Sequence, residues 1–362
     1  MYVILYLDGK RNNKKHKKTI YLQEGIIMKK QIKNNIKRKA LMTGLTALMG
    51  VAPMTAMARE ANVNVGDEYA SYGYSLDANQ RENTKRLLNA NEVVEENEIT
   101  MTPETYVSIF GGDPANIGNI YSSAYVRYED EGHGVNVDIV TPETILQVSE
   151  ETYINAAITS GMENVNIGIA STVEVTGEGG LAGIYAIQQA TGVEVDQEVA
   201  QLTNDELALN SELEDEVALD NPDATGEETN ALTNGLLADI KAEIGKLAQQ
   251  NNGGVDEGQA RDIVINIVNN YGLNLSDETI QQLVDFATRF SNTEIALSPE
   301  MQEQLAQLGN TLKEKGGDIW DGIQSTISDP EFQESAGNLW TSFVNFIKNL
   351  FSGIFGGSEA TA

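Results

Sequence analysis

Few side chains in this sequence are of types that commonly do chemistry. Its 362 residues include no cysteine and two histidines, His16 and His133. Thiolate metal sites, cysteine nucleophiles, disulfides and histidine-rich zinc sites are therefore excluded. The motifs Gly-x-Ser-x-Gly, Ser-x-x-Lys and His-Glu-x-x-His are also missing, so serine and zinc hydrolysis lack their usual parts. A pair of carboxylates could still cleave a glycosidic bond, but 54 acidic residues do not single out a pair.

One glycine-rich segment has the form of a nucleotide-binding loop. Residues 177–182 read Gly-Glu-Gly-Gly-Leu-Ala and match the pattern Gly-x-Gly-x-x-Ala after the strand-like segment Val173–Val175. Glu178, however, stands where a pyrophosphate would approach, and no basic residue is near. We therefore expect the entry of a helix in which Thr176 is the N-cap.

Two acidic segments could take part in chemistry: one surrounds His133, a possible base or metal ligand, and the other could bind a cation. His133 follows Glu129, Asp130 and Glu131, but its flanking glycines favour a turn. The loop from Asp220 to Glu228 offers oxygen ligands for calcium without the alternating Asp/Asn-then-Gly order of a helix-loop-helix site. We expect an acidic linker there and no cofactor, with calcium as the alternative.

Charge is divided unevenly along the chain. Residues 1–58 hold 12 basic and two acidic residues, whereas the remainder holds 12 basic and 52 acidic residues. No Lys or Arg occurs from Tyr128 to Ile240. Such a surface repels the phosphates of nucleic acid, so nucleic acid is excluded as a partner. Cations, cationic peptides and neutral polymers fit it better.

The amino-terminal residues have the layout of an export signal. A basic stretch begins at Met28, an apolar run follows, and Ala56 and Ala58 precede Arg59 as an Ala-x-Ala cleavage site. We interpret residues 28–58 as a signal peptide and residues 1–27 as an upstream extension outside the translated protein. The mature protein is then secreted and begins at Arg59.

Strand and helix patterns alternate over residues 59–200. We expect a helix from Ser75 to Asn89, a strand over residues 98–101, and a helix started by Thr102-Pro103-Glu104-Thr105. The same Thr-Pro-Glu-Thr segment recurs at residues 141–144, which predicts a second helix from Pro142 to Ser160.

The strands of this region predict a mixed sheet. Residues 121–128 and 135–140 would pair as a β-hairpin, and the helix from Pro142 would lead into a parallel strand over residues 165–170. The fold class is therefore α+β, with helices packed on the mixed sheet, followed by an all-α carboxyl-terminal region.

Beyond residue 200 the pattern is helical. Residues 201–228 hold ten acids and no base and are expected to form an acidic helix fragment followed by an acidic linker between domains. Residues 229–292 carry three amphipathic helices, the last capped by Ser276. Residues 293–362 form a helical tail that ends in the aromatic stripe Leu339–Phe355, which either packs on the protein or contacts a membrane surface.

Several blocks of sequence resemble a known family. These blocks are Gly73–Leu76, Ile120–Ala124, Gly134–Val137, Val140–Ile145, Tyr153–Gly161 and Val175–Glu178. They are similar to a family of secreted proteins from low-GC Gram-positive bacteria known as domain of unknown function 1002. The resemblance implies export and an envelope setting and brings no catalytic residues with it. The motif positions that it marks are Tyr121, Ser122, Ser123, Thr141, Pro142, Asn155, Thr176, Gly177 and Glu178.

These observations favour a non-enzymatic exported protein of the cell envelope. Its partner would be an envelope protein or a neutral polymer. The alternatives are a wall-polymer hydrolase that uses a carboxylate pair and a calcium-stabilised scaffold or adhesion module.

Overall fold

The structure is a computed structural model that describes residues 63–193, 195–222 and 224–315. The proposed extension 1–27, the signal peptide 28–58 with its cleavage residues Ala56, Ala58 and Arg59, and the stripe Leu339–Phe355 lie outside the described residues. Their assignments remain predictions.

The described residues form one mixed sheet of five strands in the order β2-β1-β3-β5-β4. The strands are β1 (Glu68–Gly73), β2 (Glu98–Met101), β3 (Ser123–Tyr128), β4 (Val135–Ile139) and β5 (Val165–Ala170). Parallel pairs join β1 to β2 and β4 to β5, and β3 is antiparallel to both of its neighbours. Four strands therefore run one way and β3 runs against them, which confirms the mixed sheet.

The predicted hairpin is wrong, because β5 lies between its two strands. β3 pairs with β5 from Ser123↔Ala170 to Tyr128↔Val165, and β4 pairs with β5 in parallel on the other side. β5 takes the position between β3 and β4 because it is more apolar than β4: its residues Val165, Ile167 and Ile169 are all buried. β4 exposes Asn136 and Asp138 and takes the edge. The β-α-β unit formed by β4, α4 and β5 is confirmed.

Short helices and single helical turns connect the strands, and one further helix follows β5. The helices of this region are α2 (Ala78–Leu87), α3 (Pro103–Phe110), α4 (Glu150–Thr159) and α5 (Glu178–Ala190), and the 3₁₀ turns are Ala90–Glu92, Glu95–Asn97 and Pro114–Asn116. Thr102 caps α3 as predicted, because its hydroxyl accepts a hydrogen bond from the Thr105 N–H at 3.2 Å. α2 begins later than expected, with Asp77 rather than Ser75 as its N-cap.

The second Thr-Pro-Glu-Thr segment does not start a helix. The Thr141 hydroxyl accepts hydrogen bonds from the Ser171 N–H and from the Thr144 hydroxyl, both at 2.9 Å. Thr141 therefore ties the ends of β4 and β5 together and is not available as a helix cap. α4 begins eight residues after Pro142, where the Ser149 hydroxyl accepts from the Thr152 N–H.

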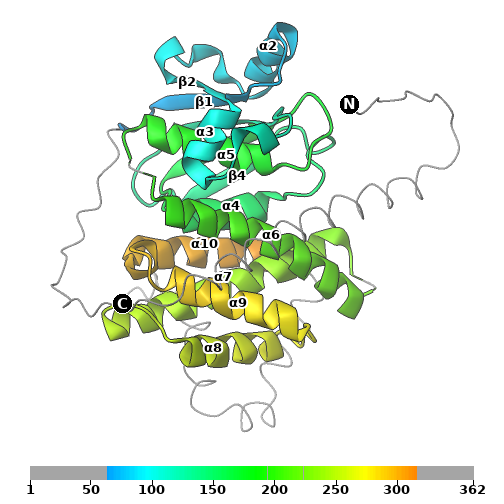
Figure 1. The fold of residues 1–362 in the computed structure, drawn as a ribbon, viewed down its shortest axis with the longest axis vertical. Helices are drawn as coiled ribbons and strands as arrows, with labels where there is room; N and C mark the ends of the chain where they lie inside the picture. Colours follow the sequence, from blue (N-terminus) through cyan, green and yellow to red (C-terminus); the bar gives the residue numbers. More distant parts are fainter. Residues whose placement is uncertain (1–62, 194, 223, 316–362) are drawn as a thin grey trace, which may run out of the picture. The chain divides into compact units, whose positions relative to one another are not determined.

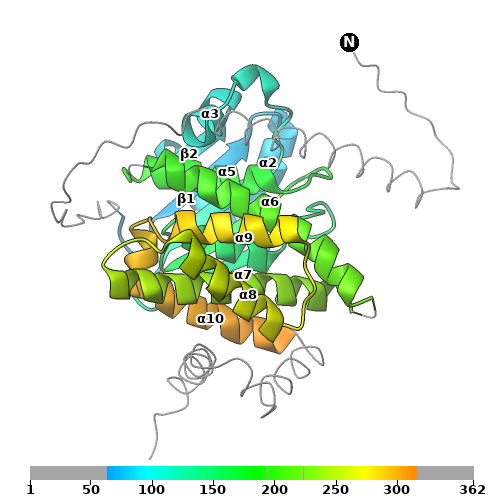
Figure 2. The same cartoon turned by 60° about the horizontal axis from the view of Figure 1, so that its bottom comes forward.

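Five longer helices make up the rest of the described chain. They are α6 (Gln197–Asp220), α7 (Gly226–Asn251), α8 (Glu257–Asn270), α9 (Asp277–Phe290) and α10 (Pro299–Lys315), with a 3₁₀ turn at Ile295–Leu297. The three predicted helices of residues 229–292 are confirmed, and the Ser276 hydroxyl caps α9 by accepting from the Thr279 N–H. Figure 2 shows α7, α8, α9 and α10 in front of the strands.

The acidic helix of residues 201–228 is longer than expected and the linker shorter, because α6 is continuous to Asp220 and α7 already begins at Gly226. Leu202, Leu213 and Val217 form a buried stripe on α6, while its acids lie mainly on the other face. α6 packs against α4, α7 and α9. The described residues therefore belong to one compact unit, in which the sheet and the helices share a core.

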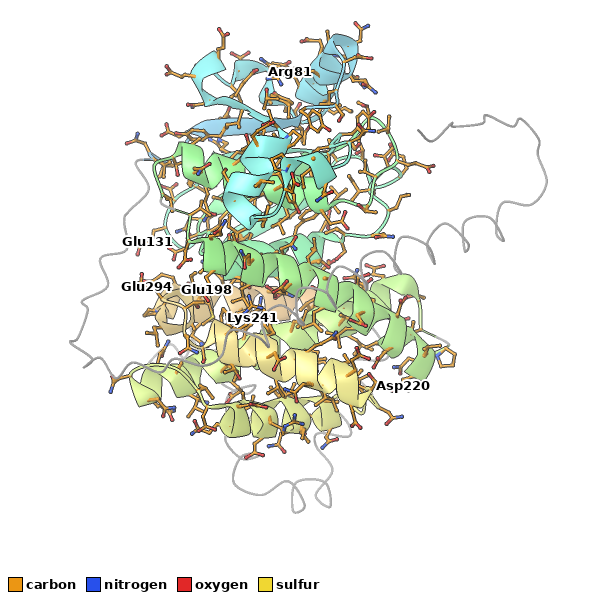
Figure 3. The ribbon with its side chains drawn as sticks, viewed as in Figure 1. Arg81, Glu131, Glu198, Asp220, Lys241 and Glu294 are labelled. Atoms are coloured by element: carbon orange, nitrogen blue, oxygen red, sulfur yellow. The ribbon has the colours of Figure 1, made fainter. Side chains whose placement is uncertain are left out.

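The two faces of the sheet are covered differently. One face packs against α4 and α5 and contributes Ala124, Val126 and Ile169 to the main core. The other face has a smaller cluster around Tyr72 and Leu88, and the Arg81 guanidinium of α2 lies 4.1 Å from the centre of the Tyr72 ring. In Figure 1, α2 lies at the upper end of the drawing, and Figure 3 marks Arg81 there.

Candidate functional site at the carboxyl end of the sheet

The strand directions bring most of the motif positions to one end of the sheet. The carboxyl ends of β1, β2, β4 and β5 meet the amino end of β3, because β3 alone runs the opposite way. Ligands of open sheets bind most often outside the carboxyl ends of strands. We call this region the carboxyl-end site and define it by Tyr74, Tyr106, Tyr121, Ser122, Thr141, Ser171, Thr176 and Glu178.

Close backbone contact joins the chain after β1 to the chain before β3. A Cβ atom at Gly73 would lie 2.2 Å from the Ile120 carbonyl oxygen and 2.9 Å from the Tyr121 Cα, so only glycine fits. The Ser123 hydroxyl accepts from the Gly73 N–H at 3.3 Å, and the Tyr74 hydroxyl donates to the Gly118 carbonyl at 3.0 Å. The rings of Tyr74 and Tyr121 are consequently held at the same end of the sheet, and neither is fully buried.

The entry to α5 contributes Thr176, Gly177 and Glu178. Gly177 is the N-cap, with a φ of 126° that favours glycine, and no side chain caps the helix; the predicted capping role of Thr176 is wrong. The Thr176 hydroxyl instead contacts the Glu178 carboxylate. The Gly177 carbonyl accepts from the buried Tyr153 hydroxyl at 2.6 Å, which fixes the loop against α4.

The glycines after Glu178 are explained by close packing. A Cβ atom at Gly179 would lie 2.5 Å from the Ser122 hydroxyl oxygen, and one at Gly180 would lie 2.7 Å from the Tyr153 hydroxyl oxygen. The first turn of α5 therefore rests on Ser122 and Tyr153, where a dinucleotide loop would need open space for a pyrophosphate. This geometry favours the interpretation as a helix entry.

The accessible part of the site consists mainly of tyrosines, because the hydroxyls of Ser122, Thr141 and Ser171 are buried. Glu178 is half-buried and lies near Tyr106 of α3, where burial first and the Glu178 charge second raise the pKa of the tyrosine. Tyrosine rings and neutral hydroxyls provide flat apolar contacts together with hydrogen bonds in both directions. This combination suits a neutral, hydroxyl-bearing ligand.

Asn155 is the one motif position that lies elsewhere. It belongs to a buried polar cluster between α4, α6 and α7, which we call the Lys241 network. The Lys241 ammonium donates to the Glu206 carboxylate at 2.8 Å, to the Thr159 hydroxyl at 3.2 Å and to the Asn155 carbonyl at 3.0 Å. The side chains of Lys241 and Glu206 are 0% and 2% exposed. Figure 3 marks Lys241 among the helices, in the middle of the drawing.

The network extends along α4 through amide groups. The Asn155 side chain donates to the Asn234 side-chain oxygen at 2.9 Å, and Asn210 of α6 donates to the same oxygen at 3.1 Å. Burial lowers the pKa of Lys241, while the Glu206 charge opposes that shift. All three ammonium protons have acceptors, which is the condition for holding a charge inside a core.

Sequence reasoning did not find the Lys241 network, although a signal was present. Lys241 is the first base after a long stretch without one, and it follows Asn234 by seven residues, or two helical turns. A polar pair on the apolar stripe of α7 indicates a buried partner. Identifying that partner as Glu206 requires the packing of α6 on α7.

His133 lies at the opposite end of the sheet, in the loop between β3 and β4. Its Nε2 atom is 2.9 Å from the Asn166 side-chain oxygen, and Asn166 donates to Glu129 at 2.6 Å. Glu129 also accepts from Arg127 at 2.7 Å, so this carboxylate is already paired. The turn interpretation agrees with the position of His133 between two glycines of positive φ.

Two residues of the candidate calcium loop make hydrogen bonds within the protein. Asp220 accepts from the Asn274 N–H at 2.6 Å, and Glu228 accepts from the Thr225 N–H at 2.8 Å in a capping box. Among the described residues, no group of three or more acidic, histidine or cysteine side chains is placed to hold a metal ion. Calcium stabilisation remains an untested prediction.

No helix of the described ranges is both long enough and apolar enough to cross a membrane.

Comparison with known proteins places the described unit within a family. The family model described as protein of unknown function (DUF1002) matches residues 72–308, which include the end of β1, the other four strands and the helices from α2 to α9. The uncharacterized protein YpuA of Bacillus subtilis (strain 168) is 25% identical over 264 residues, which cover 71% of this chain and 83% of that protein. No solved structure matches the chain.

Proposed function

The chain belongs to the DUF1002 family of proteins of unknown function, and from this premise we propose that it is an exported, non-enzymatic binding protein of the cell envelope whose carboxyl-end site holds a neutral polymer. The observation that carries the proposal is the convergence of tyrosine rings and hydroxyl groups from separate segments at the carboxyl end of the sheet. Export is supported by the signal-peptide layout of residues 28–58.

The charge of the site favours a neutral ligand over an anionic one. Glu178 is half-buried in the site, and residues 128–240 contain no Lys or Arg. A phosphate or carboxylate ligand would meet repulsion without a compensating cation. A glycan strand of the cell wall has the required chemistry, because its hydroxyl groups can exchange hydrogen bonds with Thr176 and the tyrosine hydroxyls while its apolar ring faces stack on the tyrosine rings.

The test is a binding measurement on the mature protein, residues 59–362. Titration calorimetry with soluble oligosaccharides released from isolated wall glycan should give saturable binding by the wild type. Tyr121→Ala and Tyr74→Ala should each weaken binding by about fivefold to tenfold, since each removes one ring contact. His133→Ala, at the opposite end of the sheet, is the matched control and should bind like the wild type.

Two results would overturn the proposal. Equal affinity of the wild type and both tyrosine variants would remove the carboxyl-end site from consideration. Release of new reducing ends from the same oligosaccharides by the purified protein would show a hydrolase instead. Amino-terminal sequencing of the native protein checks the export part, for which we expect the first residue to be Arg59 in the culture medium or the envelope fraction.

A further inference from the structure

β4 is an edge strand with an unpaired outer side. It is last in the sheet order and pairs only with β5. The Val165 N–H donates to the Gly134 carbonyl, and the Val140 N–H donates to the Ile169 carbonyl, both at 2.9 Å. Because backbone groups alternate along a strand, even-numbered residues of β4 face β5 and odd-numbered residues face outward.

The outward backbone groups are only partly satisfied. The Ile139 N–H donates to the Glu150 carboxylate at 3.3 Å. Across the described ranges 63–193, 195–222 and 224–315, no hydrogen bond closes on the outward N–H or C=O of Val137. Exposed edge strands are often protected by lysine or proline, and β4, with the sequence Val-Asn-Val-Asp-Ile, contains neither. This edge can therefore accept another strand.

The surroundings of β4 are acidic. Asp130 and Glu131 lie in the loop that enters the strand, Asp138 is exposed on it, and Glu143 is exposed after it. Figure 3 marks Glu131 at the left of the drawing. Glu163, which precedes β5, has a pKa that is raised by burial first and by the nearby Glu300 charge second. Carboxylates thus crowd both ends of the strand, and an incoming strand with positive charges would relieve their repulsion.

The two faces of β4 define which side chains an added strand should carry. Asn136 and Asp138 are exposed on one face, whereas Val135 and Ile139 are buried on the face covered by α4, with Val137 half-buried between them. Side chains of paired strands meet on the same face. An added strand should therefore place basic residues beside Asp138 and small apolar residues beside Val137.

We propose that the outer edge of β4 binds an extended segment of a partner protein in which apolar and basic residues alternate, so that this segment becomes a sixth strand of the sheet. Backbone hydrogen bonds to Val137 hold the segment, and the carboxylates around β4 select its charge. The site is separate from the carboxyl-end site and does not depend on the function proposed there.

The experiment uses the mature chain and a synthetic probe. An acetylated, fluorescently labelled octapeptide of alternating valine and lysine should bind the wild type in an anisotropy titration, with weaker binding at 0.5 M NaCl. The matched peptide of alternating valine and glutamate should bind at least tenfold more weakly, because it adds negative charge beside Asp138.

Two variants separate backbone pairing from charge. Val137→Pro removes an outward N–H that takes no part in pairing with β5, so the sheet should form while peptide affinity falls at least tenfold. Asp138→Lys should weaken binding severalfold, whereas Asp262→Lys, the same charge change at an exposed position of α8, should leave the affinity unchanged. Circular dichroism verifies that each variant is folded.

Three outcomes would overturn the proposal. They are failure of the valine–lysine peptide to bind the wild type, wild-type affinity in folded Val137→Pro, and equal affinity for the lysine and glutamate peptides. A concentration-dependent dimer that Val137→Pro abolishes, without any peptide binding, would show that the edge pairs with a second copy of the chain instead.

Discussion

Lys241 and Glu206 form an ion pair whose energy depends on both partners. Each side chain is almost fully buried, and the pair also holds Thr159, whose hydroxyl is 2.5 Å from Glu206. A buried pair gives up hydration that its Coulomb attraction only partly restores, so its net contribution to stability is small. Loss of one partner is different, because the remaining charge stays buried without compensation.

We therefore expect Lys241→Met to lower the free energy of unfolding by about 3–5 kcal/mol. The double variant Glu206→Leu/Lys241→Met should recover most of that loss, because no buried charge remains. Chemical denaturation of both variants measures the difference. Lys246→Met, which removes a lysine with 38% of its side chain exposed, is the control and should cost about 1 kcal/mol or less. A double variant as unstable as the single one would show that the network stabilises through its hydrogen bonds and not only through its charges.

The segment after β1 and the segment before β3 are held together by close backbone contact at the carboxyl-end site. Gly73 ends β1 directly against the backbone at Ile120, and backbone atoms cannot move aside as a side chain can. The Ser75 hydroxyl adds a second connection, because it accepts from the Ile120 N–H at 3.1 Å. These contacts hold Tyr74 and Tyr121 in the carboxyl-end site.

Gly73→Ala should accordingly lower the free energy of unfolding by about 1–3 kcal/mol, the usual cost of forcing a methyl group into a packed region. Gly118→Ala, in the loop before β3, is the matched control: an added Cβ there has no neighbour within 4 Å, and the change should stay within about 0.5 kcal/mol. Thermal melting compares the two variants. Equal melting temperatures would mean that the chain before β3 moves freely and that the site is not preformed.

Across the whole molecule, the excess of acids makes stability depend on pH. The pKa of Glu214 is raised to about 7 by burial first and then by Asp215 and Glu151. Burial also raises the pKa of Asp239 to about 7, against the opposing effect of its hydrogen bond from Tyr271. The folded state binds these protons more tightly than the unfolded state, so the stability from these groups is present at low pH and is lost as pH rises toward 7. Glu98 has the opposite effect. Burial raises its pKa, but Lys85 and Arg81 outweigh burial and lower the pKa, so the stability that Glu98 contributes is present near neutral pH and is lost in acid.

The melting temperature should therefore rise when the pH is lowered from about 8 to about 5.5, and it should fall again under stronger acid. Glu214→Gln and Asp239→Asn should each flatten the rise, because each removes one titrating group. Asp262→Asn, a substitution at an exposed carboxylate of α8, should leave the profile unchanged. A melting temperature that climbs steadily from pH 5.5 to 8 would contradict this prediction. Differential scanning calorimetry across the range provides the measurement.

The segments whose pattern is local were predictable from residues alone. Thr102 as the cap of α3, Ser276 as the cap of α9, and the amphipathic helices after residue 229 depend on neighbours within one or two turns. The alternation of strands and helices also indicated a mixed sheet with a β-α-β unit. These features follow from periodicity and capping, which act over a few residues.

Contacts between distant segments required the folded chain. Thr102 and Thr141 begin identical four-residue segments, yet Thr141 binds the backbone of Ser171 and ends β4 rather than starting a helix. The place of β5 between β3 and β4, the burial of α6 and the pairing of Lys241 with Glu206 likewise depend on which apolar surfaces are covered together. Hydrophobic burial is non-directional, so periodicity shows that a face is buried but not against what. The sequence thus determined most of the elements, and the tertiary packing decided the order of the strands in the sheet, the partners of each element and the gathering of the motif residues at one end of the sheet.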